Sequence, residues 1–264
     1  MKTEIKVLDK GYVKLIDHMG SDKMIVNAAR TSYDSKSKSA SDDSKLISYL
    51  MRHEHSTPFE MCEMIFLIKC PIFVARHIVR HRTASMSEIS ARYTKLEEDF
   101  YVPEHMRVQS SSNKQASEEG NVPNETDILD AITKVSEQMF SLYNVFTEIG
   151  VAREQARMIL PLNVYTKFYW KMDLRNLLHF LKLRMHPHTQ WETQEYARAI
   201  AEFVKSTFPV TWEHFENHVL GSLTLSKSEI SLIREFGDAK SIREHSDDAP
   251  SSKEFLEKLN ILGL

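Results

Sequence analysis

The side chains in this sequence best suited to chemistry are basic and clustered. Arg80, His81 and Arg82 stand in a row, and Ser90 and Arg92 follow a few residues later. Cations also gather at the carboxyl ends of helices, where they complement the helix dipole, so an isolated Arg-His-Arg has a purely structural explanation. Arginine guanidinium groups, however, match pairs of phosphate oxygens, and nearby serine hydroxyls add further donors. The pattern therefore predicts a phosphate-binding site.

A second basic group lies near residue 180. Arg175, His179 and Lys182 recur at spacings of four and three residues, which places them on one side of a helix whose other side is rich in leucine. A solvated helix face explains such a stripe when it stands alone. Arg184 follows where the chain leaves the helix for a loop, a place where functional groups are often displayed.

A metal site is the main alternative, since His53, His55 and Glu60 carry groups that bind zinc. The two histidines of a His-x-His unit share a face only on a strand, and no third imidazole follows at ligand spacing, so we predict no metal. The seven glycines form neither a Gly-x-Gly-x-x-Gly motif nor a Walker loop. Any dinucleotide must therefore bind without these fingerprints.

The segment after Pro71 must position the first basic group. Proline is typical of a first helical turn, and the pattern predicts a helix over Pro71–Arg82. On such a helix Arg76 and Arg80 would share one face, with His77 and His81 beside them. This density of positive charge requires anions to offset its self-repulsion.

Strands and helices are both expected along the chain. Strands are predicted at Ile5–Leu8, Tyr12–Ile16, Glu63–Cys70 and Val164–Met172. Helices are predicted at Asp22–Ala29, Asp42–Met51, Ile128–Ile149, Val151–Leu160, Leu174–Leu183, Gln190–Phe208, Val210–Val219, Lys227–Phe236 and Lys253–Leu262. The polar segment 107–127 has a composition that cannot bury enough surface to order itself, and we expect a mobile surface loop there.

Composition narrows the class of protein. The 264 residues are 42% hydrophobic, which is ordinary for a folded globular chain, and the net charge of -3 disfavours a general nucleic-acid coat. Cys62 and Cys70 are too few and too far apart for a disulfide framework or a Cys-x-x-Cys pair, so we expect a reducing cytoplasm. No apolar run is long enough for an export signal or a membrane span.

The segment RHRTASMSEISARY, with Arg80-His81-Arg82 followed after seven residues by Ser90, resembles the signature of the flavin-dependent thymidylate synthases. Other segments resemble the same family in the expected order: NAARTSYD (27–34), HSTPFE (55–60), CPIFVARHIVRHR (70–82), ARMILPLNVYTKFYW (156–170) and LHFLKLR (178–184). The resemblance covers residues 1 to about 217.

The resemblance implies a single α/β domain over residues 1–219, with a central mixed or antiparallel sheet flanked by helices and no Rossmann motif. Residues 220–264 would form a helical extension. It also implies a homotetramer whose active sites lie where subunits meet. Residues expected to contact FAD are Thr57, Arg80, His81, Arg82, Glu88, Arg175 and His179. Residues expected to contact the nucleotide are His77, Arg80, Glu88, Ser90, Arg92, Arg157 and Arg184.

The implied reaction converts dUMP to dTMP, with methylenetetrahydrofolate as carbon donor and FAD reduced by NADPH as hydride source. Arg184 has the most specific role, because it would favour the ionised form of the uracil ring. Ser90 would hold phosphate rather than act as a nucleophile. Two positions depart from many relatives: His77 stands in place of a glutamine, and Asp173 in place of an asparagine.

Two other classes of function are alternatives to a thymidylate synthase. A non-catalytic nucleotide- or RNA-binding module would use the arginines only for electrostatic attraction, but Arg80–Arg92 contains no aromatic platform for bases. A metal-dependent phosphohydrolase would use His53, His55 and Glu60, and it lacks a convincing set of acidic ligands. Uptake of FAD by the purified protein separates these three functions.

Overall fold

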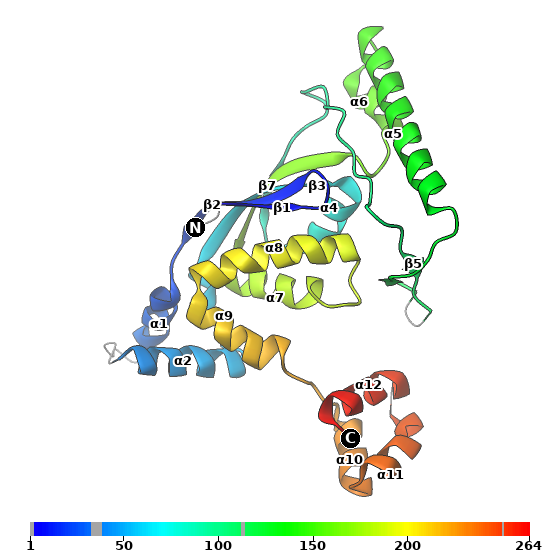
Figure 1. Ribbon diagram of the computed structural model, residues 1–264. Helices are drawn as coiled ribbons and strands as arrows, with labels where there is room; N and C mark the ends of the chain where they lie inside the picture. Colours follow the sequence, from blue (N-terminus) through cyan, green and yellow to red (C-terminus); the bar gives the residue numbers. More distant parts are fainter. Residues whose placement is uncertain (1–2, 33–38, 112–113, 250) are drawn as a thin grey trace. The chain divides into compact units, whose positions relative to one another are not determined.

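A five-stranded antiparallel sheet lies at the centre of the first compact unit, residues 1–216 (Figure 1). The computed structural model describes residues 3–32, 39–111, 114–249 and 251–264. The strands lie in the order β1 (Glu4–Val7), β2 (Gly11–Met19), β3 (Glu63–Pro71), β7 (Tyr165–Asp173) and β4 (Ser85–Glu88). The predicted α/β fold with a central sheet is confirmed, and the sheet is antiparallel. The four predicted strands correspond to β1, β2, β3 and β7, whereas β4 was not predicted.

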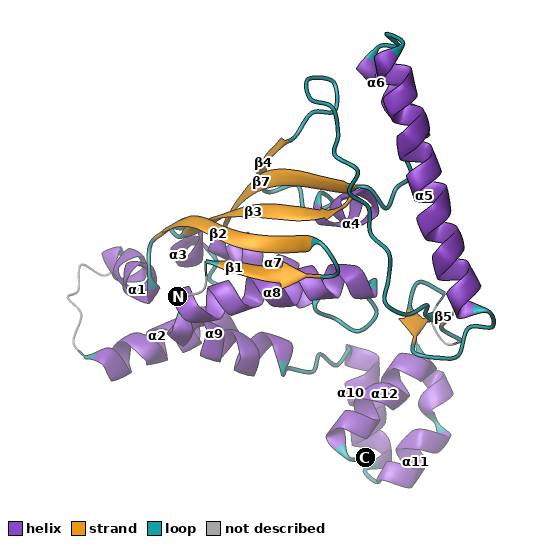
Figure 2. Cartoon of the chain, turned by 45° about the horizontal axis from the view of Figure 1, so that its top comes forward, coloured by secondary structure: helices purple, strands orange, loops and turns teal. Residues whose placement is uncertain are grey.

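Helices α7 (Leu174–Arg184) and α8 (Trp191–Thr207) cover one face of this sheet (Figure 2). The other helices that accompany the sheet are α1 (Asp22–Thr31), α2 (Ala40–Arg52), α3 (Thr57–Glu60), α4 (Ile72–Ile78), α5 (Glu125–Glu148), α6 (Arg153–Ala156), the 3-10 helix η1 (Arg157–Ile159) and α9 (Pro209–Phe215), which continues into the π-helix η2 (Glu216–Leu220). Helices α7 and α8 pack directly on the sheet. The Trp170 and Phe180 ring centroids are 5.0 Å apart, and those of Phe66 and Phe203 are 6.1 Å apart.

Strands β3 and β7, predicted from their large apolar, aromatic and β-branched residues, bury alternate side chains. Along β3 every second side chain, including that of Phe66, is fully buried, and Trp170 on β7 is 1% exposed. The side chains between them point to the opposite face, where Lys167 and Tyr169 are exposed. Burying one face of the sheet against α7 and α8 fixes the register, because a slip of one residue would exchange the two faces.

The helix predicted over Pro71–Arg82 is wrong at its carboxyl end, because α4 ends at Ile78. Its last turn is tightened by bonds to carbonyls three residues back, from Arg80 N to His77 O and from His81 N to Ile78 O. The chain turns here because the next segment pairs with β7 as strand β4. Arg80 and His81 therefore lie in a loop and do not continue the faces of Arg76 and His77.

The segment 107–127, predicted as a mobile loop, contains regular structure. Strands β5 (Val108–Gln109) and β6 (Ser117–Glu118) form a short hairpin, and α5 begins at Glu125. Residues 112–113 lie outside the described residues, and the mobility of the segment stays a prediction. The helix predicted over Val151–Leu160 is instead two short turns, α6 and η1.

The second compact unit is Asn217–Leu264. It contains α10 (Lys227–Phe236), α11 (Ala239–Glu244), the 3-10 helix η3 (Ser246–Asp248) and α12 (Ser252–Leu262). The two tail helices predicted from the sequence match α10 and α12. A small apolar core holds the unit together, and it consists of Leu232, Ile242, Ala249, Phe255 and Leu259. In the described part of the chain, no helix combines the length and the apolar character that crossing a membrane requires.

Candidate active site

Arg184, the last residue of α7, meets the loop that follows α4. Its Nε donates a hydrogen bond of 3.0 Å to Nε2 of His81. The His81 ring in turn lies edge-on to Phe180, with centroids 4.9 Å apart, and 6.1 Å from the ring of His179. We call His77, Arg80, His81, His179 and Arg184 the Arg184 cluster. The structure thus brings together residues from the two basic groups of the sequence.

Four side chains of the Arg184 cluster are partly dehydrated, and burial lowers the pKa of each: His77, His81, His179 and Arg184. Burial, the Arg184 charge and His179 lower the pKa of His81 to about 4. Burial and the Arg80 charge lower the pKa of Arg184 from its usual value. Burial and Arg184 also lower the pKa of His77, which Glu192 partly opposes. At neutral pH, His81 is therefore uncharged, and its Nε2 can accept the hydrogen bond that the Nε–H of Arg184 donates.

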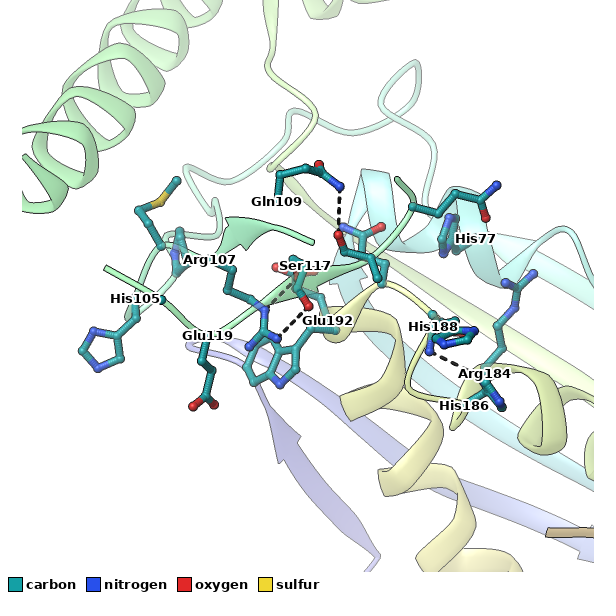
Figure 3. Close-up of a pocket in the computed structure, with 18 of the residues that line it drawn as sticks. His77, His105, Arg107, Gln109, Ser117, Glu119, Arg184, His186, His188 and Glu192 are labelled. Carbon is teal, nitrogen blue, oxygen red and sulfur yellow. Dashed lines mark hydrogen bonds between the residues drawn. The ribbon is translucent and has the colours of Figure 1, made fainter. Parts of the chain in front are cut away.

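A cavity of about 1270 Å³ adjoins this cluster. His77, Arg107, Arg184 and Glu192 are among the residues that line it (Figure 3), and Trp191 also lines it. The Arg107 guanidinium lies 5.6 Å from the centroid of the Trp191 ring, which pins the β5–β6 hairpin segment to the start of α8. Sequence reasoning missed Trp191 and Glu192, since nothing in their types or spacing marks them.

A second basic cluster lies near α6 and η1. Arg92 Nε is 3.4 Å from Glu154 Oε2, and Arg153 Nη1 donates to the carbonyl oxygen of Tyr93 at 2.9 Å. Both partners of the Arg92–Glu154 ion pair are more than half exposed, at 57% and 56%. We call Ser90, Arg92, Tyr93, Arg153 and Glu154 the Arg92 cluster. Arg157 begins η1, directly after α6. Sequence reasoning assigned no role to Tyr93, Arg153 or Glu154.

The remaining predicted site residues lie at element ends. Thr57 begins α3, which packs against α7, and Arg175 is exposed in the first turn of α7. Glu88 ends β4 and accepts a hydrogen bond from the Thr166 hydroxyl. Arg82 is exposed in the loop after α4. Within the described residues, no hydrogen bond or ion pair links these four side chains to one another or to either cluster.

The structure gives Asp173 a local role. As the N-cap of α7 it accepts a hydrogen bond from the backbone N–H of Asn176 at 2.9 Å, and its second oxygen accepts one from the Asn176 side chain at 2.7 Å. A carboxylate at this position also complements the positive end of the helix dipole. The capping of α7 therefore explains why an acidic residue stands at position 173.

The alternative metal site has no support among the residues described. They contain no group of three or more histidine, cysteine, aspartate or glutamate side chains placed to hold a metal ion. The His53 ring packs instead against Tyr49, with centroids 4.3 Å apart, and lies 6.2 Å from the His55 ring. These three rings form an aromatic contact at the end of α2.

Comparison with known proteins agrees with this geometry. The family model described as thymidylate synthase complementing protein matches residues 14–210. A flavin-dependent thymidylate synthase of Thermus thermophilus is 54% identical over 87% of this chain and 84% of its own. One of Ehrlichia ruminantium is 45% identical over 98% and 88%.

Solved structures give the same result. A crystal structure of the UMP/dUMP methylase PolB from Streptomyces cacaoi, bound with 5-Br dUMP, superposes with a TM-score of 0.75 at 33% identity, covering 81% of this chain and 98% of that one. The fold and these matches together define a methyltransferase enzyme. The chain belongs to the family of flavin-dependent thymidylate synthases.

Proposed function

We propose that this protein methylates dUMP to dTMP, with methylenetetrahydrofolate as carbon donor, FAD as bound cofactor and NADPH as its reductant. The observation that carries the proposal is the half-buried Arg184 guanidinium, oriented by neutral His81 beside a large cavity. A fixed, partly dehydrated cation is suited to stabilising negative charge on a substrate ring. Family membership supplies the class of reaction.

The side chains present fit a flavin dinucleotide. Within the described residues, Arg80 and Arg82 form no ion pair with a carboxylate, and Arg175 hydrogen-bonds only the Asn176 side chain. Exposed guanidinium groups without acidic partners suit a pyrophosphate. Thr57, His81, Glu88 and His179 complete the set that we propose to hold FAD. The chemistry that a bound flavin supplies is hydride transfer from its reduced form.

Arg184 acts on the uracil ring. Its Nε–H is directed to His81, so the two terminal nitrogens of the guanidinium remain for the substrate. Placed against the ring, this cation stabilises the form that has lost a proton at the ring nitrogen and so polarises the ring for attack. The hydrogen bond from Arg184 to His81 keeps the guanidinium in one orientation throughout.

The Arg92 cluster is suited to the phosphate of the nucleotide. Arg92 and Arg157 are exposed cations, and the Ser90 hydroxyl already lies within 3.3 Å of the Arg92 backbone nitrogen. A phosphate can take the place of the Glu154 carboxylate on Arg92, because both present paired oxygens to the guanidinium. We therefore assign Ser90, Arg92 and Arg157 to phosphate binding, with His77, Arg80, Glu88 and Arg184 toward the rest of the nucleotide.

The two clusters support assembly as a homotetramer with shared sites. In the described residues of one chain, no hydrogen bond or ion pair joins the Arg184 cluster to the Arg92 cluster. Large apolar side chains near the Arg92 cluster are exposed, among them Tyr93 at 79% and Met158 at 75%. Such patches mark protein contact surfaces. A second copy of the chain would cover this surface and bring its own Arg184 cluster to the phosphate.

The organisation of the chain follows from the same proposal. Residues 1–219 form the synthase domain and residues 220–264 a helical extension. The cytoplasm is the proposed location, in keeping with Cys62 and Cys70, which are buried free thiols. The proposed partners are the nucleotide, the folate and further copies of the chain. Neither nucleic acid nor membrane is among them.

Spectroscopy and isotope release test the function directly. The purified protein is expected to be yellow or to take up FAD. With methylenetetrahydrofolate and NADPH it should release tritium from dUMP labelled at uracil carbon 5. A colourless protein that neither binds FAD nor releases tritium would refute the proposal.

A further inference from the structure

Thr193 is a buried hydroxyl with a single partner. It stands in the first turn of α8, its side chain is 0% exposed, and its Oγ1 lies 3.3 Å from Nδ1 of His77 on α4. Buried hydroxyls are almost always hydrogen-bonded, since an unmade bond leaves the full cost of desolvation. His77 is the only partner that the described residues offer to this hydroxyl.

The direction of this hydrogen bond follows from what each group can do. A hydroxyl has one proton to donate, and Nδ1 of His77 is the acceptor within its reach. If Nδ1 carried the proton, the Thr193 proton would be left buried without an acceptor. The arrangement that satisfies both groups leaves Nδ1 unprotonated and places the ring proton on Nε2. Nε2 has no partner among the described residues, and His77 lines the cavity.

Charged groups from three elements surround His77. Arg184 reaches it from the end of α7 and Glu192 from the start of α8, while Arg76 and Arg80 flank it along α4 and the following loop. Burial and Arg184 favour the neutral ring, and Glu192 favours the charged one. A neutral ring has two tautomers, and which of them is present decides whether Nε2 donates or accepts.

We propose that Thr193 is a positioning residue that holds His77 as the Nε2–H tautomer, so that His77 donates a hydrogen bond to a carbonyl oxygen of a uracil-type ring in the cavity. This rests on the proposed function, which supplies the uracil nucleotide. A ring that presents an amino group at the same place, as cytosine does, would set one donor against another. Thr193 thereby contributes to the choice of base without touching it.

The tautomer can be measured before any nucleotide substrate is added. In long-range 1H–15N spectra of the FAD-loaded protein, assigned by the loss of signals in His77→Gln, Nδ1 of His77 should have the shift of an unprotonated nitrogen and Nε2 that of a protonated one. The Thr193→Val variant should shift these signals toward a mixture of tautomers. A wild-type spectrum with the proton on Nδ1 would overturn the proposal.

Nucleotide affinity supplies the second test, by calorimetric titration of the FAD-loaded protein with dUMP. Thr193→Val, which keeps the shape but loses the hydroxyl, should weaken dUMP binding about three- to tenfold. Thr193→Ser, which keeps the hydroxyl, should stay within about twofold of the wild type. In a His77→Gln background, Thr193→Val should change the affinity less than about twofold, because the residue through which it acts is gone.

The outcomes separate the two proposals. An equal loss from Thr193→Val in both backgrounds would show that Thr193 acts through packing alone and would refute the positioning role. A wild-type protein that binds FAD but no dUMP would refute the proposed function instead. Should Thr193→Val fail to fold, the wild-type nitrogen shifts still decide the tautomer.

Discussion

The two basic clusters of this enzyme differ in how far water has been removed from them. In the Arg184 cluster, Arg184 and His81 are partly buried and hydrogen-bonded to each other, and burial with the neighbouring charges lowers the pKa of His81 to about 4. In the Arg92 cluster the central ion pair is more than half exposed on both sides. Similar residue types thus stand in two different electrostatic environments.

The difference matches two kinds of work. Charge that must polarise a substrate ring acts most strongly from a fixed, partly dehydrated position, where the effective dielectric is low. Charge that holds a phosphate can remain in water, because a phosphate brings its own strong acceptors and charge. Substitutions of Arg184 and His81 should therefore change kcat, and those of Arg92 and Glu154 should change KM.

Arg184→Ala should have the largest effect. Removing the oriented guanidinium should lower kcat about 100- to 1000-fold, as loss of a preorganised charge does at other active sites. Steady-state tritium release measures this, and FAD absorbance together with circular dichroism checks the fold. Arg184→Lys keeps the charge but loses the Nε–H donor to His81, so it should recover only part of the rate. Wild-type turnover by Arg184→Ala would contradict the assigned role.

His81→Ala should have the next largest effect. Without its acceptor, the Arg184 guanidinium loses its fixed orientation, and kcat should fall about 10- to 100-fold. The KM for dUMP should change little, since the charge itself remains. A rise in KM at unchanged kcat would show that His81 binds substrate and does not orient Arg184.

The environment of His81 can also be tested through the pH dependence of the free energy of unfolding. Because the pKa of His81 is about 4 in the folded protein and 6.5 in its ordinary state, the unfolded chain binds more protons between these values. Stability associated with His81 is therefore complete above about pH 6.5 and is lost as the pH falls toward 4. Urea unfolding across this range should show a shallower pH slope for His81→Ala. Equal slopes in both proteins would contradict the depressed pKa.

Much of the scaffold could be predicted from the sequence, and the features that could not be predicted share one cause. Strands β3 and β7 bury alternate side chains, so they are rich in large apolar, aromatic and β-branched residues, and this composition predicted them. All four side chains of β4 are exposed, and the strand is held by backbone pairing with β7. Backbone pairing leaves no hydrophobic pattern. The end of α4 at Ile78 is likewise set by this pairing, because no helix-breaking residue follows it directly.

The candidate site also contains residues that the sequence could predict and residues that it could not. The basic residues could be named from their types and from the resemblance to the family. Their partners could not, because Thr193 and Glu154 are ordinary residues that gain a role only through the residue that the fold places beside them. The lowered pKa of His81 results from burial and from the Arg184 charge 103 positions away, and spacing along the chain reveals neither.

Arg92→Gln tests the exposed cluster. Loss of one charged phosphate contact should raise the KM for dUMP about tenfold with kcat nearly unchanged. The effect should shrink as salt is added, since exposed charges are screened. Kinetics at two ionic strengths measure both. A fall in kcat comparable to that of Arg184→Ala would remove the distinction between the clusters.

Glu154→Gln should have the smallest effect and should act in the opposite direction. The Glu154 carboxylate competes with a phosphate for the Arg92 guanidinium, so removing its charge should lower the KM for dUMP by about twofold or less, the range expected for an exposed ion pair. The same substitution in an Arg92→Gln background should change nothing, because the cation for which the carboxylate competes is absent. A raised KM in the single variant would mean that Glu154 orients Arg92 for the phosphate and does not compete with it.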